Sequence, residues 1–289
     1  MASLPKTILV FAAMMMPVLG FCGAHTYLDP REEGSETVPV ASFGYFGSGG
    51  PLMWHRLDAA NALCATGKYQ SPINMVPESF TLVPGSNLTV TLPADLPQGA
   101  TFENLGSTIE VVMEGLGGSL LFDGLDYNLT QFHFHHPSEH VNNGVSMPME
   151  MHMVFTHETT IAVIGVYIDL TDAAPSALTS VLPGSASSAM LETIFSSIDA
   201  IASPGEATKT PAFGMSELNE VLACGSYQRY SGSLTSPPCS EEVSWSVSTN
   251  KLLLSRETYL KVRDVVGFNS RFPQNAPGLP NLLELAHTA

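Results

Sequence analysis

Three histidines lie on two short segments whose side chains alternate as they do in strands. His133 and His135 occur in QFHFHH, and His152 occurs in MEMHMVF. Because successive side chains of a strand point to opposite faces, His133 and His135 point to one spot and Phe132 and Phe134 point away from it. A neighbouring antiparallel strand would bring His152 to the same spot. Three neutral imidazoles that leave a fourth position open are typical of catalytic Zn²⁺, so the pattern predicts a zinc site.

The same alternation places one polar residue beside the histidines on each segment. Gln131 shares the face of the first pair, and Glu150 shares the face of His152. Such residues usually accept the second ring N–H of a metal ligand. The alternative is that they are only polar residues on a strand face at a sheet edge. Met151 and Met153 make the surroundings apolar, and burying imidazoles without partners costs about 1–3 kcal/mol each, which favours metal binding.

The neighbouring histidines are predicted not to be ligands. His136 and His140 lie off the face of the HxH pair or beyond the strand end, and His157 is also set aside. Of these, His136 is the one whose ring could reach the mouth of a cavity.

A second kind of metal site also begins with HxH on a strand. In cupins a glutamate follows a few residues later, as Glu139 does here, and iron or manganese is then expected. The glycines and proline that a cupin needs at fixed spacings are not met by Gly124, Gly144 and Pro148.

The rest of the chain predicts one β-rich domain with peripheral helices, an α+β arrangement. The 289 residues, of which 44% are hydrophobic, suffice for a large core. Alternating or β-branched runs separated by Gly, Pro, Asn and Asp predict strands at Leu88–Leu92, Thr108–Met113, Leu129–His135, Met149–Phe155 and Ile161–Ile168. Helical spacing of apolar residues predicts helices at Ser187–Ile201 and Glu257–Val266.

The N-terminus has the pattern of a secretory signal peptide over residues 1–24. Lys6 precedes an uncharged apolar stretch, and small residues end at Ala24. A lipid anchor at Cys22 is the alternative. We find no stretch long enough for a membrane span, so a soluble mature protein is expected. The signal peptide predicts a location outside the cytosol: extracellular, periplasmic or in an organelle lumen.

That compartment is oxidising, so the cysteines are expected to pair. If Cys22 is removed, then Cys64, Cys224 and Cys239 remain, and an odd count leaves a free thiol or a link between chains. The residues alone do not fix the pairing. Asn87 and Asn128 are predicted acceptors for N-glycosylation, the second of them close to a buried strand.

The net charge of −16 excludes one class of partner. With 11 basic and 27 acidic residues, the surface repels polyanions, so we expect no binding to nucleic acid. A small neutral or monoanionic substrate is not excluded, because salt screens the repulsion.

Several motifs in a fixed order resemble the α-class carbonic anhydrases, from about Phe43 to Gln274. They are GY at Gly44, GP at Gly50, WH at Trp54, QSPIN at Gln70, QFHFH, SEH, MEMH, YSGSLTSPP and NSRFPQ. The resemblance implies a large, mostly antiparallel twisted sheet with Zn²⁺ in a conical cavity. It also implies a catalytic domain over residues 43–275, preceded by an irregular segment 25–42 and followed by a tail 276–289.

The resemblance also implies roles for single residues. His133, His135 and His152 match the zinc ligands, and Gln131 and Glu150 match the acceptors behind them. Thr235 matches the threonine that accepts a hydrogen bond from the attacking hydroxide, and Glu139 matches the glutamate that takes the threonine's own hydrogen. Further matches are the apolar wall against which CO2 lies (Val154, Val163, Leu234, Val243, Trp245), the bicarbonate end (Ser236) and the disulfide of secreted members (Cys64, Cys239).

One position departs from the family pattern. Fast members carry a histidine that carries the proton from the metal site to buffer, and ENLGSTIEV has Ser107 there. A serine hydroxyl does not exchange a proton near neutral pH as an imidazole does, so slower, buffer-dependent turnover is expected. Tyr45 matches the tyrosine that holds the water chain. His136 is the candidate substitute for the missing histidine.

The expected activity is therefore reversible hydration of CO2 to bicarbonate and a proton by a zinc lyase that sulfonamides or anions inhibit. The protein is expected to be a monomer or a dimer, and Cys224 is the candidate for a disulfide that links two chains. The competing hypothesis is a binding module on the same scaffold, since some family relatives have lost ligands and only bind partners.

Overall fold

The computed structural model describes residues 38–172 and 186–288. The predicted signal peptide, Cys22 and most of the predicted segment 25–42 lie outside these residues. The strands are β1 Asn74–Met75, β2 Thr81–Pro84, β3 Thr89–Thr91, β4 Thr101–Asn104, β5 Ile109–Val112, β6 Ser119–Phe122, β7 Leu125–His135, β8 Val141–Asn142, β9 Met149–His157, β10 Thr160–Thr171, β11 Ala207–Lys209, β12 Ser226–Ser233 and β13 Glu241–Ser255. The helices are α1 Trp54–Leu57, α2 Leu63–Thr66, α3 Ala189–Phe195, α4 Ser216–Ala223, α5 Arg256–Val266 and α6 Leu282–Thr288.

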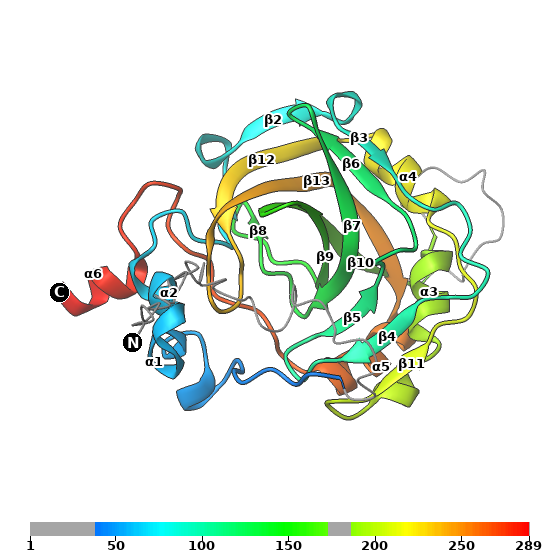
Figure 1. The fold of residues 1–289 in the computed structure, drawn as a ribbon, viewed down its shortest axis with the longest axis horizontal. Coiled ribbons are helices and arrows are strands. Elements are labelled where there is room, and N and C mark those ends of the chain that lie inside the picture. Colours follow the sequence, from blue (N-terminus) through cyan, green and yellow to red (C-terminus); the bar gives the residue numbers. More distant parts are fainter. Residues whose placement is uncertain (1–37, 173–185, 289) are drawn as a thin grey trace, which may run out of the picture.

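One 11-stranded sheet dominates the fold, and its strand order is β11-β4-β5-β7-β9-β10-β13-β12-β2, with β6 beside β7 and β3 beside β6. Within it β10 and β13 pair in parallel, and the other described pairs are antiparallel. Figure 1 shows the sheet strongly curled, with α3, α4 and α5 on one side of the molecule and α1, α2 and α6 gathered at the opposite end. The predicted mainly β fold with peripheral helices is confirmed.

The two faces of the central strands are buried in different ways. Phe132 and Phe134 of β7, with Met151 and Met153 of β9, belong to the larger hydrophobic core. The same core takes the apolar sides of the helices, including Leu191 and Ile194 of α3, Leu218 of α4 and Val262 of α5. The opposite face carries the histidines and a second apolar cluster, so the alternation of β7 and β9 separates packing from chemistry.

The predicted helix Ser187–Ile201 is interrupted. α3 ends at Phe195, and a short 3₁₀ turn covers Ile198–Ile201. At the break the Ser196 hydroxyl donates to the carbonyl of Thr193. Serine side chains that bond to nearby backbone in this way compete with helix continuation. The second predicted helix is confirmed as α5, which begins one residue earlier.

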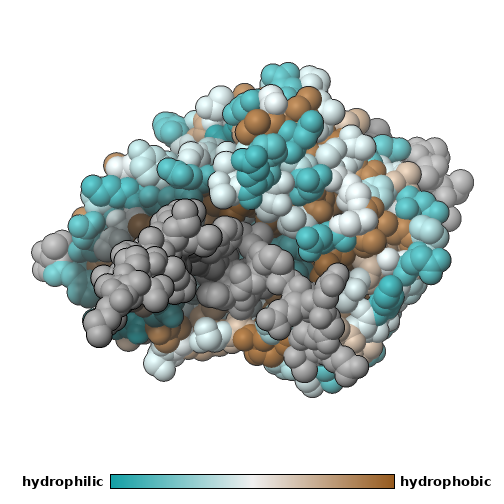
Figure 2. Space-filling model, in the orientation of Figure 1, coloured by the Kyte–Doolittle hydropathy of each residue, from teal (hydrophilic) through white to brown (hydrophobic). Residues whose placement is uncertain are grey.

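The chain after residue 275 includes the helix α6, and the buried Asn281 before it donates to the carbonyl of Gly67. The two predicted glycosylation residues, Asn87 and Asn128, are both exposed. Among the described helices, none has the length and apolar character of a membrane span. The face in Figure 2 is a mixture of hydrophilic and smaller hydrophobic areas.

Candidate metal centre and active site

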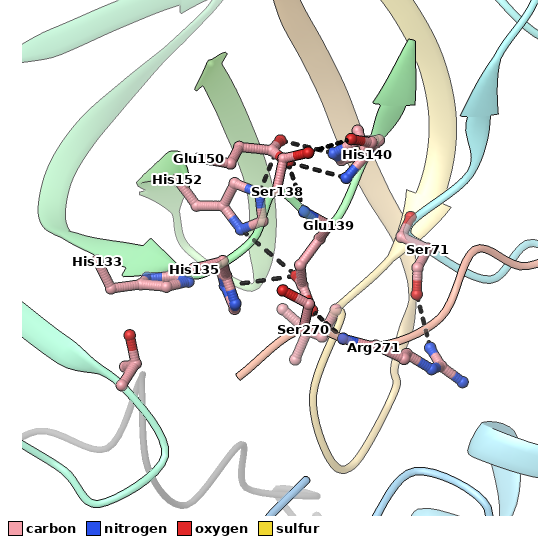
Figure 3. A network of polar contacts seen from close by, with 12 residues as sticks. Ser71, His133, His135, Ser138, Glu139, His140, Glu150, His152, Ser270 and Arg271 are labelled. Carbon is pink, nitrogen blue, oxygen red and sulfur yellow. Dashed lines mark hydrogen bonds and ion pairs between the residues drawn. The ribbon is translucent and has the colours of Figure 1, made fainter. Parts of the chain in front are cut away.

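The pairing of β7 with β9 brings the three predicted ligands together. In the antiparallel register His133 lies directly opposite His152, and His135 follows two residues later on the same face. One ring nitrogen of each residue lies within 4.8 Å of the corresponding nitrogen of the other two. All three side chains are buried, and Figure 3 shows the rings grouped at one point.

The outer nitrogens of the two β7 histidines are held by carbonyl oxygens. Nδ1 of His133 lies 2.9 Å from Oε1 of Gln131, and Nδ1 of His135 lies 2.8 Å from the main-chain oxygen of Asn269. A carbonyl oxygen only accepts, so each Nδ1 carries the hydrogen. The lone pair of each ring is therefore on Nε2.

His152 is held in the opposite orientation. Its Nε2 lies 3.0 Å from Oε1 of Glu150, so that its Nδ1 is the nitrogen left to face the other two rings. Oε2 of Glu150 accepts from the main-chain N–H groups of Glu139 and His140, and Oε1 lies 2.7 Å from Nδ1 of His140. Burial alone would raise the pKa of Glu150, but His140 and His152 lower that pKa well below its usual range.

The three clustered imidazoles fit a divalent cation. Burial, and then the neighbouring histidines, lowers the pKa of His133 well below its usual value and that of His135 to about 3, so both rings are neutral at pH 7. Metal binding requires this neutral form. Nε2 of His135 is buried and makes no hydrogen bond within the described structure. A cation bound at the three lone pairs would satisfy this atom and explain why three imidazoles are buried together.

A second group, made of His140, Glu150 and His152, also has metal-ligating atoms close together. Both ring nitrogens of His140 are already used, one by Glu150 and the other by the Tyr230 hydroxyl at 2.7 Å. This group is a hydrogen-bonded network and leaves no lone pairs directed at a common point.

Glu139 and Thr235 lie beside the histidine cluster. Oε2 of Glu139 is 3.4 Å from Nε2 of His135 and 3.9 Å from Nδ1 of His152, and Oε1 accepts from the main-chain N–H of Arg271 at 2.8 Å. Burial raises the pKa of Glu139 to about 7, against the lowering effect of His152 and of hydrogen bonds from Arg271 and Thr235. A cation at the histidines would oppose this rise and favour the ionised carboxylate of Glu139.

The predicted apolar residues also lie together, next to His152. Val154, Val163, Val243 and Trp245 belong to one buried cluster, against which Leu234 packs. The Trp245 ring centroid is 4.8 Å from that of His152. Trp245 also donates from Nε1 to the carbonyl of Ser233, which fixes the start of the loop that carries Thr235 and the buried Ser236.

Comparisons with known proteins agree with this geometry. The sequence pattern described as "Eukaryotic-type carbonic anhydrase" matches residues 49–276. The chain belongs to the eukaryotic-type carbonic anhydrase family. "Alpha carbonic anhydrase 6" of Arabidopsis thaliana is 32% identical over 249 residues, 86% of each chain. The predicted enzyme class is thereby confirmed, and the cupin alternative is wrong.

Two solved carbonic anhydrase structures are similar throughout. The fungal alpha carbonic anhydrase from Aspergillus oryzae has a TM-score of 0.77 and 38% identity, covering 86% of this chain and 99% of its own. The alpha carbonic anhydrase from Thermovibrio ammonificans in complex with the inhibitor sulfanilamide has a TM-score of 0.66 and 35% identity, covering 82% and 96%.

The residues that resemble the proton pathway of carbonic anhydrases are placed as follows. Ser107 is buried, and its carbonyl oxygen accepts from Nδ2 of Asn269 at 3.1 Å. Tyr45 packs edge-on against Trp54, with ring centroids 5.6 Å apart. His136 points to α5, where its ring nitrogens lie 2.7 Å from the carbonyl oxygen of Gly267 and 2.8 Å from the hydroxyl of Tyr259. Because both of its nitrogens are occupied there, this geometry does not favour His136 as a proton carrier.

The Cys64–Cys239 disulfide expected of a secreted carbonic anhydrase is present, and Cys224 is free and exposed. Arg271, which the sequence analysis did not single out, is buried beside the disulfide. Its guanidinium donates to the carbonyls of Cys64 and Ser71 and to the side chain of Gln70. Asn269 was also missed as the acceptor for His135. Both residues lie in the NSRFPQ motif, which was the available signal.

Proposed function

We propose that the protein catalyses the reversible hydration of CO2 to bicarbonate and a proton, with Zn²⁺ held by His133, His135 and His152. One observation carries the proposal: the ring nitrogens of three imidazoles converge beside a Glu139–Thr235 pair and an apolar cluster. Bound at the three nitrogens, Zn²⁺ would supply a Lewis acid and lower the pKa of solvent water to about 7.

Gln131, Asn269 and Glu150 fix the orientation of the three rings. Oxygens of Gln131 and Asn269 accept from the outer nitrogens of His133 and His135, and a carboxylate oxygen of Glu150 lies beside the outer nitrogen of His152. The lone pairs of the three rings therefore stay directed inward. Such partners usually preserve both the tautomer and the angle of a ligand.

Thr235 and Glu139 orient the attacking oxygen. The carboxylate of Glu139 accepts the hydrogen of the Thr235 hydroxyl, so the hydroxyl oxygen can only accept from the nucleophile. A nucleophile that donates its hydrogen to Thr235 has its lone pair directed to the substrate. Fixing this geometry before reaction removes part of the entropic barrier.

The apolar cluster gives CO2 a suitable surface. CO2 is uncharged and accepts hydrogen bonds weakly, so Val154, Val163, Val243 and Trp245 offer contact without competing polar groups. Leu234 and Ser236 flank Thr235, and Ser236 is assigned to the end where bicarbonate forms.

The last step is release of a proton. With serine at position 107, buffer molecules must accept the proton by way of water, so this step limits the rate when buffer is weak. Tyr45 is assigned to holding the water chain.

The disulfide supports an oxidising compartment, in agreement with the predicted secretion. We assign the protein to a secreted location and retain a monomer or a dimer linked through the exposed Cys224. Sulfonamides or anions are expected to inhibit at the metal.

Stopped-flow hydration of CO2, measured together with zinc content and inhibition by sulfanilamide, tests the proposal. We expect one zinc per chain, hydration well above the uncatalysed rate and loss of it with sulfanilamide. One zinc per chain without hydration would favour the binding module instead.

A further inference from the structure

His140 is a buried, polar residue for which the proposed function has no role. Its side chain is 0% exposed, and its ring lies 4.8 Å from that of Trp245 and 5.9 Å from that of His152. Figure 3 shows His140 next to Glu150. It belongs to neither β7 nor β9, because it lies in the segment between them.

A chain of hydrogen bonds runs from Ser71 through Tyr230 and His140 to Glu150, and each group donates to the next. Nδ1 of His140 donates to the carboxylate of Glu150 at 2.7 Å, so in a ring that carries a single hydrogen Nε2 is an acceptor. The Tyr230 hydroxyl at 2.7 Å must then donate to Nε2, and the oxygen of Tyr230 accepts from the Ser71 hydroxyl at 2.7 Å. Ser71 in turn accepts from the main-chain N–H of Ser233 at 3.0 Å.

Glu150 lies at the end of this chain and has little freedom to move. Three hydrogen bonds from Glu139 and His140 and the approach of His152 occupy both of its oxygens. Gly165, the register partner of His152 in β10, makes the room: a Cβ there would lie 2.9 Å from Oε1 of Glu150.

We propose that Ser71, Tyr230 and His140 form a positioning relay that sets the metal affinity of the site through Glu150. Because a carboxylate only accepts, Glu150 keeps the hydrogen on Nδ1 of His140. The relay holds the same ring at Nε2, which keeps Glu150 in place for the Nε2–H of His152. Nδ1 of His152 then remains a metal-facing lone pair. This inference rests on the proposed function only in taking the three histidines as the metal site.

The hydroxyl of Tyr230 belongs to the relay, whereas its ring contributes only packing. The ring of Tyr230 stacks on Trp245, with centroids 6.3 Å apart, and Tyr230→Phe keeps that ring. Without the hydroxyl, the buried Nε2 of His140 loses its hydrogen-bond partner, and the ring is held only from the Glu150 side. The hydrogen bond from His140 to Glu150 would then be less well oriented, and so would Oε1 of Glu150 toward Nε2 of His152.

The test compares Tyr230→Phe with Tyr227→Phe, which removes a buried tyrosine hydroxyl from the same strand. The Tyr227 hydroxyl donates to the carbonyl of Leu222, in the other core. Zinc dissociation constants from chelator competition should rise about 10-fold for Tyr230→Phe, the lower end for partners of metal ligands, and stay unchanged for Tyr227→Phe. Equal constants for wild type and Tyr230→Phe, or equal increases in both variants, would overturn the relay.

Nitrogen NMR of the wild-type protein gives an independent reading if Tyr230→Phe does not fold. The relay requires hydrogen on Nδ1 of His140 and none on Nε2, and the opposite tautomer would contradict it. Both measurements are independent of turnover. A protein that binds zinc and shows the relay without hydrating CO2 would disprove the proposed function and leave this inference standing.

Discussion

His133 and His152 face each other across β7 and β9, with their ring centroids 5.3 Å apart. This pairing sets the geometry of the candidate metal centre. A slip of one residue in the register would move His152 to the face occupied by Met151 and Met153, in the larger core. The packing of those methionines and of Phe132 therefore holds the histidines in place.

Thr235→Val should lower kcat/KM for CO2 hydration about 100-fold, because the nucleophile loses the acceptor that orients it. Zinc content should be unchanged, since Thr235 is not among the three ligands. Stopped-flow rates measure the effect, and Thr66→Val, at an exposed threonine, is the control. A rate within a few-fold of wild type would remove Thr235 from the mechanism.

Ser107→His should raise the maximal rate in weak buffer, because an imidazole near neutral pH can pass the proton to solvent. The rate at saturating buffer should hardly change, since the chemical step is unaffected. A series of buffer concentrations separates the two. If the variant shows no gain in weak buffer, the serine at position 107 is not the cause of slow proton release.

Loss of the hydroxyl should change the free energy of unfolding in opposite directions at two buried tyrosines. The hydroxyl of Tyr167 makes no hydrogen bond within the described structure, whereas that of Tyr227 donates to Leu222. Tyr167→Phe should raise the free energy of unfolding by about 1 kcal/mol, and Tyr227→Phe should lower it by about 1 kcal/mol. Denaturant titration measures both, and destabilisation by Tyr167→Phe would show that its hydroxyl has a partner.

Protonation of Glu192 at low pH should lower the stability of the protein, because this carboxylate connects α3 to the start of α5. Its carboxylate accepts from the main-chain N–H of Ser255 and from the hydroxyls of Ser187 and Thr258. Burial would raise the pKa of Glu192, but these hydrogen bonds lower it below its usual value. The folded protein therefore binds this proton less readily than the unfolded chain, so the contribution to stability is present above pH about 4.3 and lost below it.

Glu192→Gln should accordingly be less stable than wild type by about 1–2 kcal/mol at pH 7, and the difference should shrink as the pH falls below 4. Unfolding curves across this pH range measure the difference. Glu257→Gln, at an exposed position of α5, is the control. A difference that is constant with pH would mean that the charge of Glu192 contributes nothing.

The strands that carry the histidines were predictable because alternation is a local property. QFHFH and MEMH each assign their own faces, and the structure places Gln131 beside His133 and Glu150 beside His152. The helix α5 was predictable for a similar reason, since its apolar spacing is regular. The break at Ser196 was not predicted, because the apolar pattern continues through it.

The contacts that hold the site from a distance were not predictable from spacing. Asn269 reaches His135 across 134 residues, and Tyr230 reaches His140 across 90. His140 was set aside because it lies off the ligand face, and only the fold brings it to Glu150. Whether a polar residue has a partner of this kind depends on the path of loops that carry no periodic pattern.

Anomalous diffraction at the zinc absorption edge from crystals of the zinc-loaded protein tests the central claim most directly. We predict one strong peak about 2.0–2.1 Å from Nε2 of His133, Nε2 of His135 and Nδ1 of His152, with the fourth ligand from solvent. A peak elsewhere, or a fourth protein atom bound to the metal, would contradict the account.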